Sequence, residues 1–248
     1  MNFFLILTFL FAIGSIFGWG IEVIYRRFVS QKHWVNPGFL TGPALPLYGM
    51  SLSILYLLAG VENDISIDRI WVRKLLLFIV MAIAITCLEF LVGELTLRVA
   101  KIRLWDYTKC FGNIRGMICP QYSFYWMLMS AIYYFFIHPH ILNALNWLAQ
   151  NLAFSFAIGF FYGIFMIDLA YSAQIIIKIR QFATDREIIV RLEELREDIY
   201  HNLEQRKKHH FLLSLHTGRP LSETLEFYRE KHFGTDKIKK KIQQHIKH

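Results

Sequence analysis

Charged residues make up only 19% of this 248-residue chain, and cysteine is scarce, with three residues. Cys110 and Cys119 do not have Cys-x-x-Cys spacing and Cys87 lies in an apolar run, so neither a disulfide framework nor a metal site is indicated. The sequence has no Gly-x-x-x-x-Gly-Lys-Ser/Thr motif, which excludes a P-loop nucleotide site, and no HExxH, GxSxG or SxxK signature. We therefore expect no metal and no cofactor, and a non-enzymatic protein is favoured, although a catalytic site dispersed along the chain stays open.

Apolar residues, in contrast, are abundant, with 55% hydrophobic and 16% aromatic residues. Runs of about 18 apolar residues or more span the hydrocarbon core of a bilayer as helices. The sequence thus predicts an all-α, polytopic helical membrane protein. The net charge of +8 indicates membrane topology and contact with anionic lipid rather than a nucleic-acid partner.

We predict five membrane-spanning helices, at about residues 3–25, 47–61, 71–99, 120–137 and 152–177. Residues 138–150 resemble a short interfacial segment. The first span has no basic leader and no cleavage site, so we expect it to be retained rather than removed as a signal peptide. This divides the chain into a transmembrane domain, residues 1–179, and a soluble helical tail, residues 180–248.

The distribution of Lys and Arg predicts the orientation. The loops after the first and third spans and the tail are basic, whereas the loops after the second and fourth spans are not. We expect the protein to lie in a bacterial plasma membrane. By the positive-inside rule, its N-terminus lies outside the cell and its C-terminus lies in the cytoplasm. The basic cluster Arg69, Arg73 and Lys74 is a mild violation.

Four carboxylates lie within the predicted spans, and on this topology all fall in the cytoplasmic half. Glu22 and Glu94 each stand four residues before an arginine, which is typical of an interfacial ion pair. Glu89 lies deeper among apolar neighbours, and Asp168 lies within the last span; an ionisable residue at such depth indicates a functional site or a satisfied structural contact. For Glu22 a pathway role and a simple ion pair both stay open.

Two loops stand out at the same predicted face. Residues 36–49 contain Pro43 and Pro46 with several glycines and interrupt the entry to the second span, as in the broken helices of transporters or as in a simple proline-initiated helix. Residues 101–126 are aromatic and basic, and Arg115 could bind an anionic group or pair with Asp106. The candidate binding or pathway residues are Glu22, Gly42, Pro43, Pro46, Tyr48, Glu89, Trp105, Asp106, Tyr107, Asn113, Arg115 and Asp168.

Two GxxxG motifs, Gly14 with Gly18 and Gly159 with Gly163, predict close helix contacts and a homo-oligomer. In the tail, residues 184–187 have the pattern of a capping box that begins a helix. Apolar residues follow at coiled-coil-like spacing, residues 218–220 break the helix, and Ser222 and Thr235 begin two further short helices. The tail is predicted either to dock on a partner or lipid, or to be a solvated helical hairpin.

Several motifs occur in a fixed order along the first two thirds of the chain. They are Gly18-Trp19 with Glu22, Gly38-Phe39-Leu40, Gly42-Pro43, Pro46-Leu47-Tyr48-Gly49, Glu89, Leu104-Trp105-Asp106-Tyr107, Asn113-Ile114-Arg115-Gly116 and Ile118-Cys119. In these motifs, over about residues 3–135 and more weakly through the last span, the chain resembles the bacterial membrane proteins called putative type IV ABC-transporter permeases. Ile114 stands where that pattern often has Lys or Arg. The resemblance implies a permease-like membrane protein and brings neither a substrate nor catalytic residues.

These observations together lead to a transport-related membrane subunit as the first hypothesis, with a separate ATPase bound at the cytoplasmic face. Two alternatives stay open. One is a membrane-embedded enzyme that acts on a lipid or lipid-linked substrate at the cytoplasmic leaflet. The other is a membrane scaffold that recruits partners through its tail.

Overall fold

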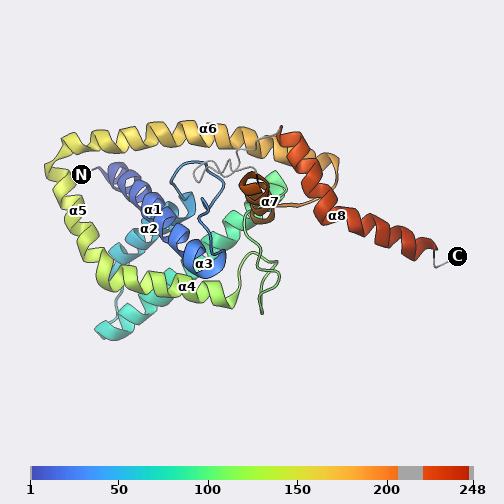
Figure 1. Cartoon of the computed structure of the whole chain (residues 1–248). Coiled ribbons are helices and arrows are strands. Elements are labelled where there is room, and N and C mark those ends of the chain that lie inside the picture. Colours follow the sequence, from blue (N-terminus) through green and yellow to red (C-terminus); the bar gives the residue numbers. More distant parts are fainter. Residues whose placement is uncertain (1, 206–219, 246–248) are drawn as a thin grey trace.

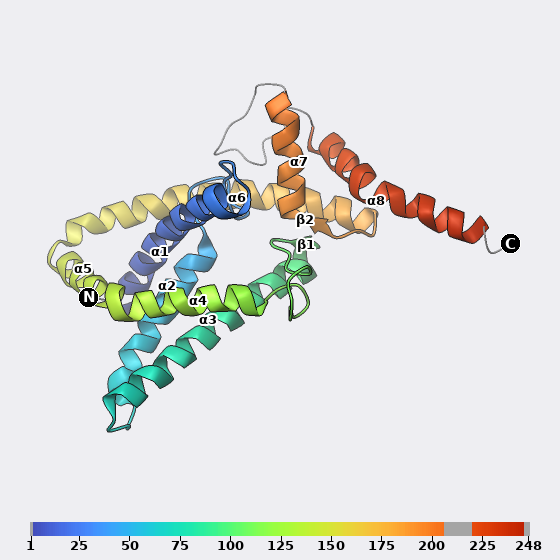
Figure 2. The same cartoon turned by 60° about the horizontal axis from the view of Figure 1, so that its bottom comes forward.

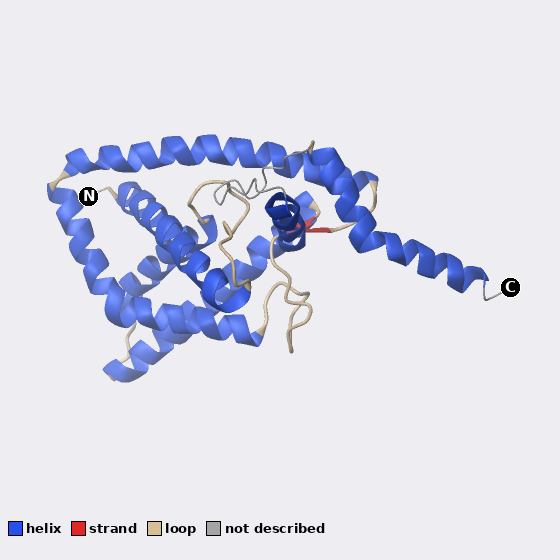
Figure 3. Ribbon diagram, in the orientation of Figure 1, coloured by secondary structure: helices blue, strands red, loops and turns tan. Residues whose placement is uncertain are grey.

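The computed structural model describes residues 2–205 and 220–245, with side chains omitted at positions 63, 152, 201–205 and 234–245. Most of this part is helical, with two long loops, residues 31–45 and 104–119, and two small strands (Figures 1 and 3). The main helices are α1 (Phe3–Tyr25), α2 (Pro46–Gly60), α3 (Ile70–Ala100), α4 (Pro120–Ile132), α5 (His138–Gln150), α6 (Ser155–Asp185), α7 (Leu192–Gln205) and α8 (Leu221–His245).

The predicted all-α membrane class is confirmed. By length and composition, three described helical segments can cross a membrane: Phe3–Ser30, Ile70–Ala100 and Ser155–Asp185. The predicted spans at residues 3–25 and 71–99 agree with α1 and α3 to within one residue at each end. The second predicted span is the shorter apolar helix α2, and the fourth is α4 continued by a π-helical turn, η3 (Tyr133–Ile137). The count of five stays a prediction.

Small residues bring α1 and α2 into close contact. A Cβ at Gly14 would lie 2.9 Å from the Leu52 Cβ and from the Tyr48 carbonyl oxygen. At Gly18 it would lie 2.2 Å from the Tyr48 Cβ. The first GxxxG motif therefore allows this contact, as its pattern predicts.

The end of the molecule that holds the N-terminus of α1 has an apolar core shared by α1, α2, α3, η3 and α5. Leu10, Met81 and Ile85 lie at its centre with almost no exposed surface. Figure 2 shows α3 and α4 side by side, and these two helices are in contact. A short 3-10 turn, η2 (Val61–Asp64), joins α2 to the segment before α3.

The helix α6 runs along one edge of the structure (Figure 1). It contacts α1 through Tyr162 and Phe165, whose rings lie 6.1 and 5.6 Å from the ring of Phe11 in α1. Much of its surface is apolar and exposed, for example Phe156 at 79% and Ile167 at 73%. Lipid chains suit such a surface.

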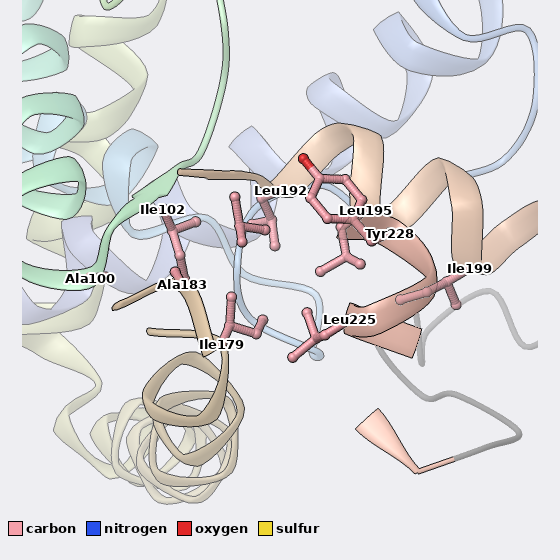
Figure 4. Close-up of a cluster of buried hydrophobic side chains, with 10 residues drawn as sticks. Ala100, Ile102, Ile179, Ala183, Leu192, Leu195, Ile199, Leu225 and Tyr228 are labelled. Atoms are coloured by element: carbon pink, nitrogen blue, oxygen red, sulfur yellow. The ribbon is translucent and has the colours of Figure 1, made fainter. Parts of the chain in front are cut away.

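The tail packs against the opposite end of the bundle. The strand β1 (Ile102–Arg103), which follows α3, pairs in parallel with β2 (Val190–Arg191), with Ile102 opposite Val190. Around this pair lies a second apolar core formed by α3, α6, α7 and α8 (Figure 4). Its buried members are Ala100, Ile102, Ile179, Ala183, Val190, Leu192, Leu195, Ile199, Leu225 and Tyr228.

Two details of the predicted tail are wrong. The residues of the proposed capping box, 184–187, end α6 instead of beginning a helix: the Ile188 amide donates to the Ala183 carbonyl, and Glu187 adopts φ +54°. The next helix begins at Leu192, because β2 first pairs with β1. One helix, α8, runs through Thr235, so the two short helices predicted there are a single helix. Two further parts of the prediction lie outside the described part: residues 218–219 of the break, and the side chain of Leu203, the last apolar residue of the coiled-coil-like series.

Candidate functional site

Four candidate residues from four segments meet inside the bundle. Glu22 from α1 accepts a hydrogen bond from the Tyr48 hydroxyl of α2, at 3.0 Å. Glu89 from α3 accepts one from the Tyr107 hydroxyl, also at 3.0 Å, and Tyr107 lies in the loop after β1. Tyr48 interacts electrostatically with both carboxylates. We call Glu22, Tyr48, Glu89 and Tyr107 the acid–tyrosine cluster.

Glu89 is the most deeply placed member, with 2% of its surface exposed. Its Oε1 accepts from Tyr107, and the Trp126 indole of α4 also interacts with the carboxylate. Its Oε2 has no hydrogen-bond partner of ordinary geometry in the described part of the chain. A buried carboxylate oxygen left without a donor is costly, so this atom is the one most available to a ligand or a proton.

Aromatic rings line the cluster. The Tyr48 ring lies 5.0 Å from the Trp126 ring, and the Tyr107 ring stacks on Tyr122 at 4.2 Å with an angle of 11° between the planes. Burial, followed by the Glu89 charge, raises the pKa of Tyr107 far above its ordinary value. Tyr107 therefore stays protonated and donates to Glu89 over the physiological range.

The cluster continues to the tail through Arg26, which follows α1 in the π-helical turn η1 (Arg26–Ser30). Its Nε donates to Glu22 at 2.9 Å, which is the predicted i,i+4 ion pair, and its Nη2 donates to Glu193 of α7 at 2.9 Å. Glu22 therefore forms the ion pair with Arg26 and also belongs to the polar network with Tyr48. A line of charged and phenolic groups runs from Tyr48 to α7.

Asp168 has a different set of contacts. It accepts hydrogen bonds from the Thr41 amide at 3.0 Å, the Gly42 amide at 2.9 Å and the hydroxyls of Thr41 and Ser172. Gly42 permits this approach, because a Cβ there would lie 2.9 Å from the Asp168 Oδ2. Asp168 therefore holds the Pro/Gly loop against α6.

The same loop is also held by α1. Trp19 donates to the Asn36 side chain at 2.7 Å, and the Asn36 amide donates to the Thr41 carbonyl at 2.6 Å. The Leu45 amide donates to the Ser15 carbonyl at 3.0 Å. Pro43 lies within this fixed loop and Pro46 is the first residue of α2, so both shape the segment that presents Tyr48.

The loop of residues 101–119 is built on its own side chains. Asn113 donates to the Thr108 and Cys110 carbonyls and accepts from the Gly116 amide. Trp105 donates to the Met117 carbonyl at 2.8 Å and lies beside Gly93 of α3. Trp105 and Asn113 thus order the loop that carries Tyr107.

The two charged candidates of this loop do not pair with each other. Asp106 forms ion pairs with Arg103 at 3.1 Å and with Arg191 of β2 at 3.0 Å. Arg115 forms an ion pair with Glu94 of α3 at 3.0 Å, and Arg98 contacts the same Glu94 oxygen at 2.5 Å. Asp106 therefore joins the loop to the tail, and Arg115 joins it to α3.

Sequence reasoning did not single out three residues of this region, Tyr122, Trp126 and Glu193. It also did not predict the ion pair between Arg115 and Glu94. Tyr122 and Trp126 belong to an aromatic run at the start of α4, which was a usable signal. Glu193 lies 167 positions from Arg26, so no local pattern could identify it. Among the described residues, no three His, Cys, Asp or Glu side chains are grouped in a way that could hold a metal ion.

Membrane-length helices and a buried acid–tyrosine cluster define an integral membrane protein with polar groups inside its helix bundle. Comparison with protein families adds one finding: residues 9–173 match the family described as Putative ABC-transporter type IV, and the chain belongs to this family. Neither the curated proteins nor the solved structures include a match to the chain. The family relates the chain to ABC transporters and agrees with a membrane location and with association with other transporter subunits.

Proposed function

We propose that this chain is the membrane-spanning permease subunit of an ABC transporter and that the acid–tyrosine cluster lies on its substrate or coupling pathway. The observation that carries the proposal is the meeting of Glu22, Tyr48, Glu89 and Tyr107 from four segments. Ionisable groups buried among membrane helices are costly and commonly mark substrate, ion or proton paths. Glu89 Oε2, which has no hydrogen-bond partner of ordinary geometry among the described residues, gives such a path a point of contact.

A separate subunit must supply ATP hydrolysis, because the sequence contains no P-loop motif. The tip of the loop offers a docking surface. Phe111 is 96% exposed, with exposed Lys109 and Arg115 nearby in the sequence. An exposed aromatic flanked by basic groups is the composition typical of a protein interface.

In this proposal the loop and the tail face the cytoplasm of a bacterial plasma membrane, and the N-terminus lies outside. The support is the excess of Lys and Arg in the loops after the first and third predicted spans and in the tail. Residues 1–179 form the permease-like domain and residues 180–248 the cytoplasmic tail, which contacts the loop through β1 and β2.

The test is co-purification of the full chain with an ABC ATPase, sought first among the products of the genes that neighbour its own. We expect a stable complex that moves a solute in proteoliposomes when ATP is supplied. Phe111→Asp should weaken the complex, whereas Phe227→Asp, at a half-exposed aromatic of α8, should not. A chain that binds no ABC ATPase and transports no solute contradicts the proposal.

One observation favours a second candidate, a membrane-embedded enzyme acting on a lipid or lipid-linked substrate. Glu89 Oε2 has no partner of ordinary geometry among the described residues and lies in the same carboxylate that binds the Tyr107 phenol, so it could accept or donate a proton at a bound substrate. Under this alternative, turnover of a lipid occurs without ATP and is abolished by Glu89→Gln with the fold intact. Lipid-synthesis genes beside this gene would support it, and an ATPase gene would favour transport.

A further inference from the structure

Arg196 in α7 is a buried arginine, with 5% of its surface exposed. Its Nε and Nη2 atoms have no hydrogen-bond partner in the part of the chain that the structure describes. These two nitrogens form one edge of the guanidinium group, and this edge is the one that binds the two oxygens of a carboxylate or phosphate side by side. No described residue therefore occupies the edge that is best suited to an oxyanion.

The described residues around Arg196 do not supply that oxyanion. The carboxylate that interacts with Arg196 is Glu193, one turn earlier on α7, and its Oε1 already accepts from Arg26. Burial lowers the pKa of Arg196 to about 9, the Arg26 charge acts in the same direction, and Glu193 opposes both. Arg196 is thus still a cation at neutral pH, and a buried cation without a bonded anion is unfavourable.

Arg196 lies close to Arg26 of η1. The surface of η1 indicates what kind of anion could reach the Nε–Nη2 edge of Arg196. In η1 and the segment after it, Phe28 is 65% exposed, Val29 is 59% and Trp34 is 49%. Arg27 lies over the rings of Phe28 and Trp34, at 5.8 and 5.7 Å from their centroids. Exposed aromatic and basic groups together are typical of the layer where lipid phosphates lie.

We propose that Arg196, with Arg26 beside it, binds a phosphate group through its Nε–Nη2 edge. The phosphate belongs to an anionic lipid headgroup or to a free phosphate ion, and the two sources share this chemistry. In this proposal the phosphate reaches the Nε–Nη2 edge of Arg196 when Glu193 breaks its hydrogen bond with Arg26, or when α7 moves away from η1. The bound phosphate joins the end of α1 to the tail, and this role is independent of the proposed transport function.

The experiment uses the full chain purified in a maltoside detergent, which carries no phosphate. Its thermal unfolding is followed with inorganic phosphate, phosphatidylglycerol or diacylglycerol added, and with chloride at matched ionic strength. We expect phosphate or phosphatidylglycerol to raise the unfolding temperature, and diacylglycerol and chloride to have no such effect. A response to phosphatidylglycerol alone identifies a lipid headgroup, and equal responses to both identify a site for the phosphate group itself.

The variant Arg196→Met should unfold at the same or a higher temperature than the natural chain without ligand, since it removes a buried unpaired charge. It should also lose the shift caused by phosphate. Arg196→Lys keeps the charge and loses the two-nitrogen edge, so phosphate should bind about tenfold more weakly or worse. Arg180→Met removes an exposed arginine of α6 and should leave the response unchanged.

Native mass spectrometry of the same samples counts bound phosphatidylglycerol directly and covers the case of a variant that does not fold. Loss of one tightly bound lipid in Arg196→Lys, with none lost in Arg180→Met, supports the site. The proposal is wrong if the natural chain responds to neither phosphate nor phosphatidylglycerol, or if Arg196→Lys responds as the natural chain does.

Discussion

The helices α1 and α6 carry the same two features, a GxxxG motif and a carboxylate, but the surroundings of these features differ between the two helices. In α1 the glycines are covered by α2, and Glu22 takes part in a polar network with Tyr48 and Arg26. In α6 an added Cβ at Gly159 or Gly163 would meet nothing within 4 Å, while Asp168 is bonded to several donors. The GxxxG motif alone therefore does not show whether its face is covered within the chain; the neighbouring helix decides this, and α2 covers the face of α1.

The glycines give the largest expected difference. Gly18→Leu places side-chain atoms where Tyr48 lies, so α1 and α2 must separate, and we expect a loss of about 3 kcal/mol or more in stability. Gly163→Leu has open space and should leave the unfolding temperature of the monomer nearly unchanged. Thermal unfolding in detergent measures both variants.

The open face of α6 is where we expect a second copy to pack, as GxxxG faces do in membranes. Gly163→Leu should therefore reduce the homo-oligomer seen by crosslinking in lipid nanodiscs, although it spares the fold. An unfolded Gly163→Leu variant, or a stable Gly18→Leu variant, would remove the contrast between the two motifs.

Asp168 gives the next effect. Asp168→Ala leaves the part-buried amides of Thr41 and Gly42 without their acceptor, and a hydrogen bond to a charged group contributes about 1.5–3 kcal/mol. We expect a marked fall in the unfolding temperature and faster proteolysis of the loop at residues 36–45. Ser172→Ala removes one donor and keeps the acceptor, so its effect should be small; equal stability of the two variants would show that Asp168 does not hold the loop.

The tail is held by both ionic and apolar contacts, and these two kinds of contact should respond differently to pH. The expected effect is smaller than those above. Burial opposes the ionisation of Asp106, but the Thr108 hydrogen bonds and the Arg103 and Arg191 charges outweigh it and lower its pKa. Because the folded pKa lies below the unfolded value, the carboxylate stabilises the docked tail above a pH of about 4 and loses this effect as the pH falls through the folded pKa.

We therefore expect the tail to become more accessible to hydrogen exchange in acid, by an energy of about 1 kcal/mol or less. Asp106→Asn should show this accessibility at neutral pH and little further change in acid. The apolar contacts of Ile179 and Ala183 should not respond to pH, and an identical acid response in Asp106→Asn would assign the effect to another group.

The sequence predicted the helical membrane class, because apolar runs are local patterns, and four of its candidate residues lie together in the structure. Apolar runs bounded α1 and α3, and Glu89 was singled out by its apolar neighbours. The sequence could not show which partner each group meets. Asp168 resembled Glu89 in sequence, yet it accepts hydrogen bonds from Thr41 and Gly42, which lie 127 and 126 positions away.

The tail shows the same limit. The pattern at residues 184–187 satisfied the rule for a helix start, but the pairing of β2 with β1, almost ninety positions earlier, ends α6 there instead. Likewise, Arg115 was expected to bind an anion or pair with Asp106, and it pairs with Glu94. Long-range contacts of this kind decide where a helix ends and which partner a charged residue meets.

The most direct test of the account is ATP hydrolysis by the reconstituted complex with Glu89→Gln, beside Glu62→Gln as a matched control. Glu62 also accepts from a tyrosine, Tyr134, at 2.6 Å, but it lies at the other end of the bundle. We predict that Glu89→Gln keeps the natural unfolding temperature and complex formation while solute-coupled ATP hydrolysis falls about tenfold or more, and that Glu62→Gln keeps most of it. Equal hydrolysis in Glu89→Gln and the natural chain would contradict a working role for the cluster.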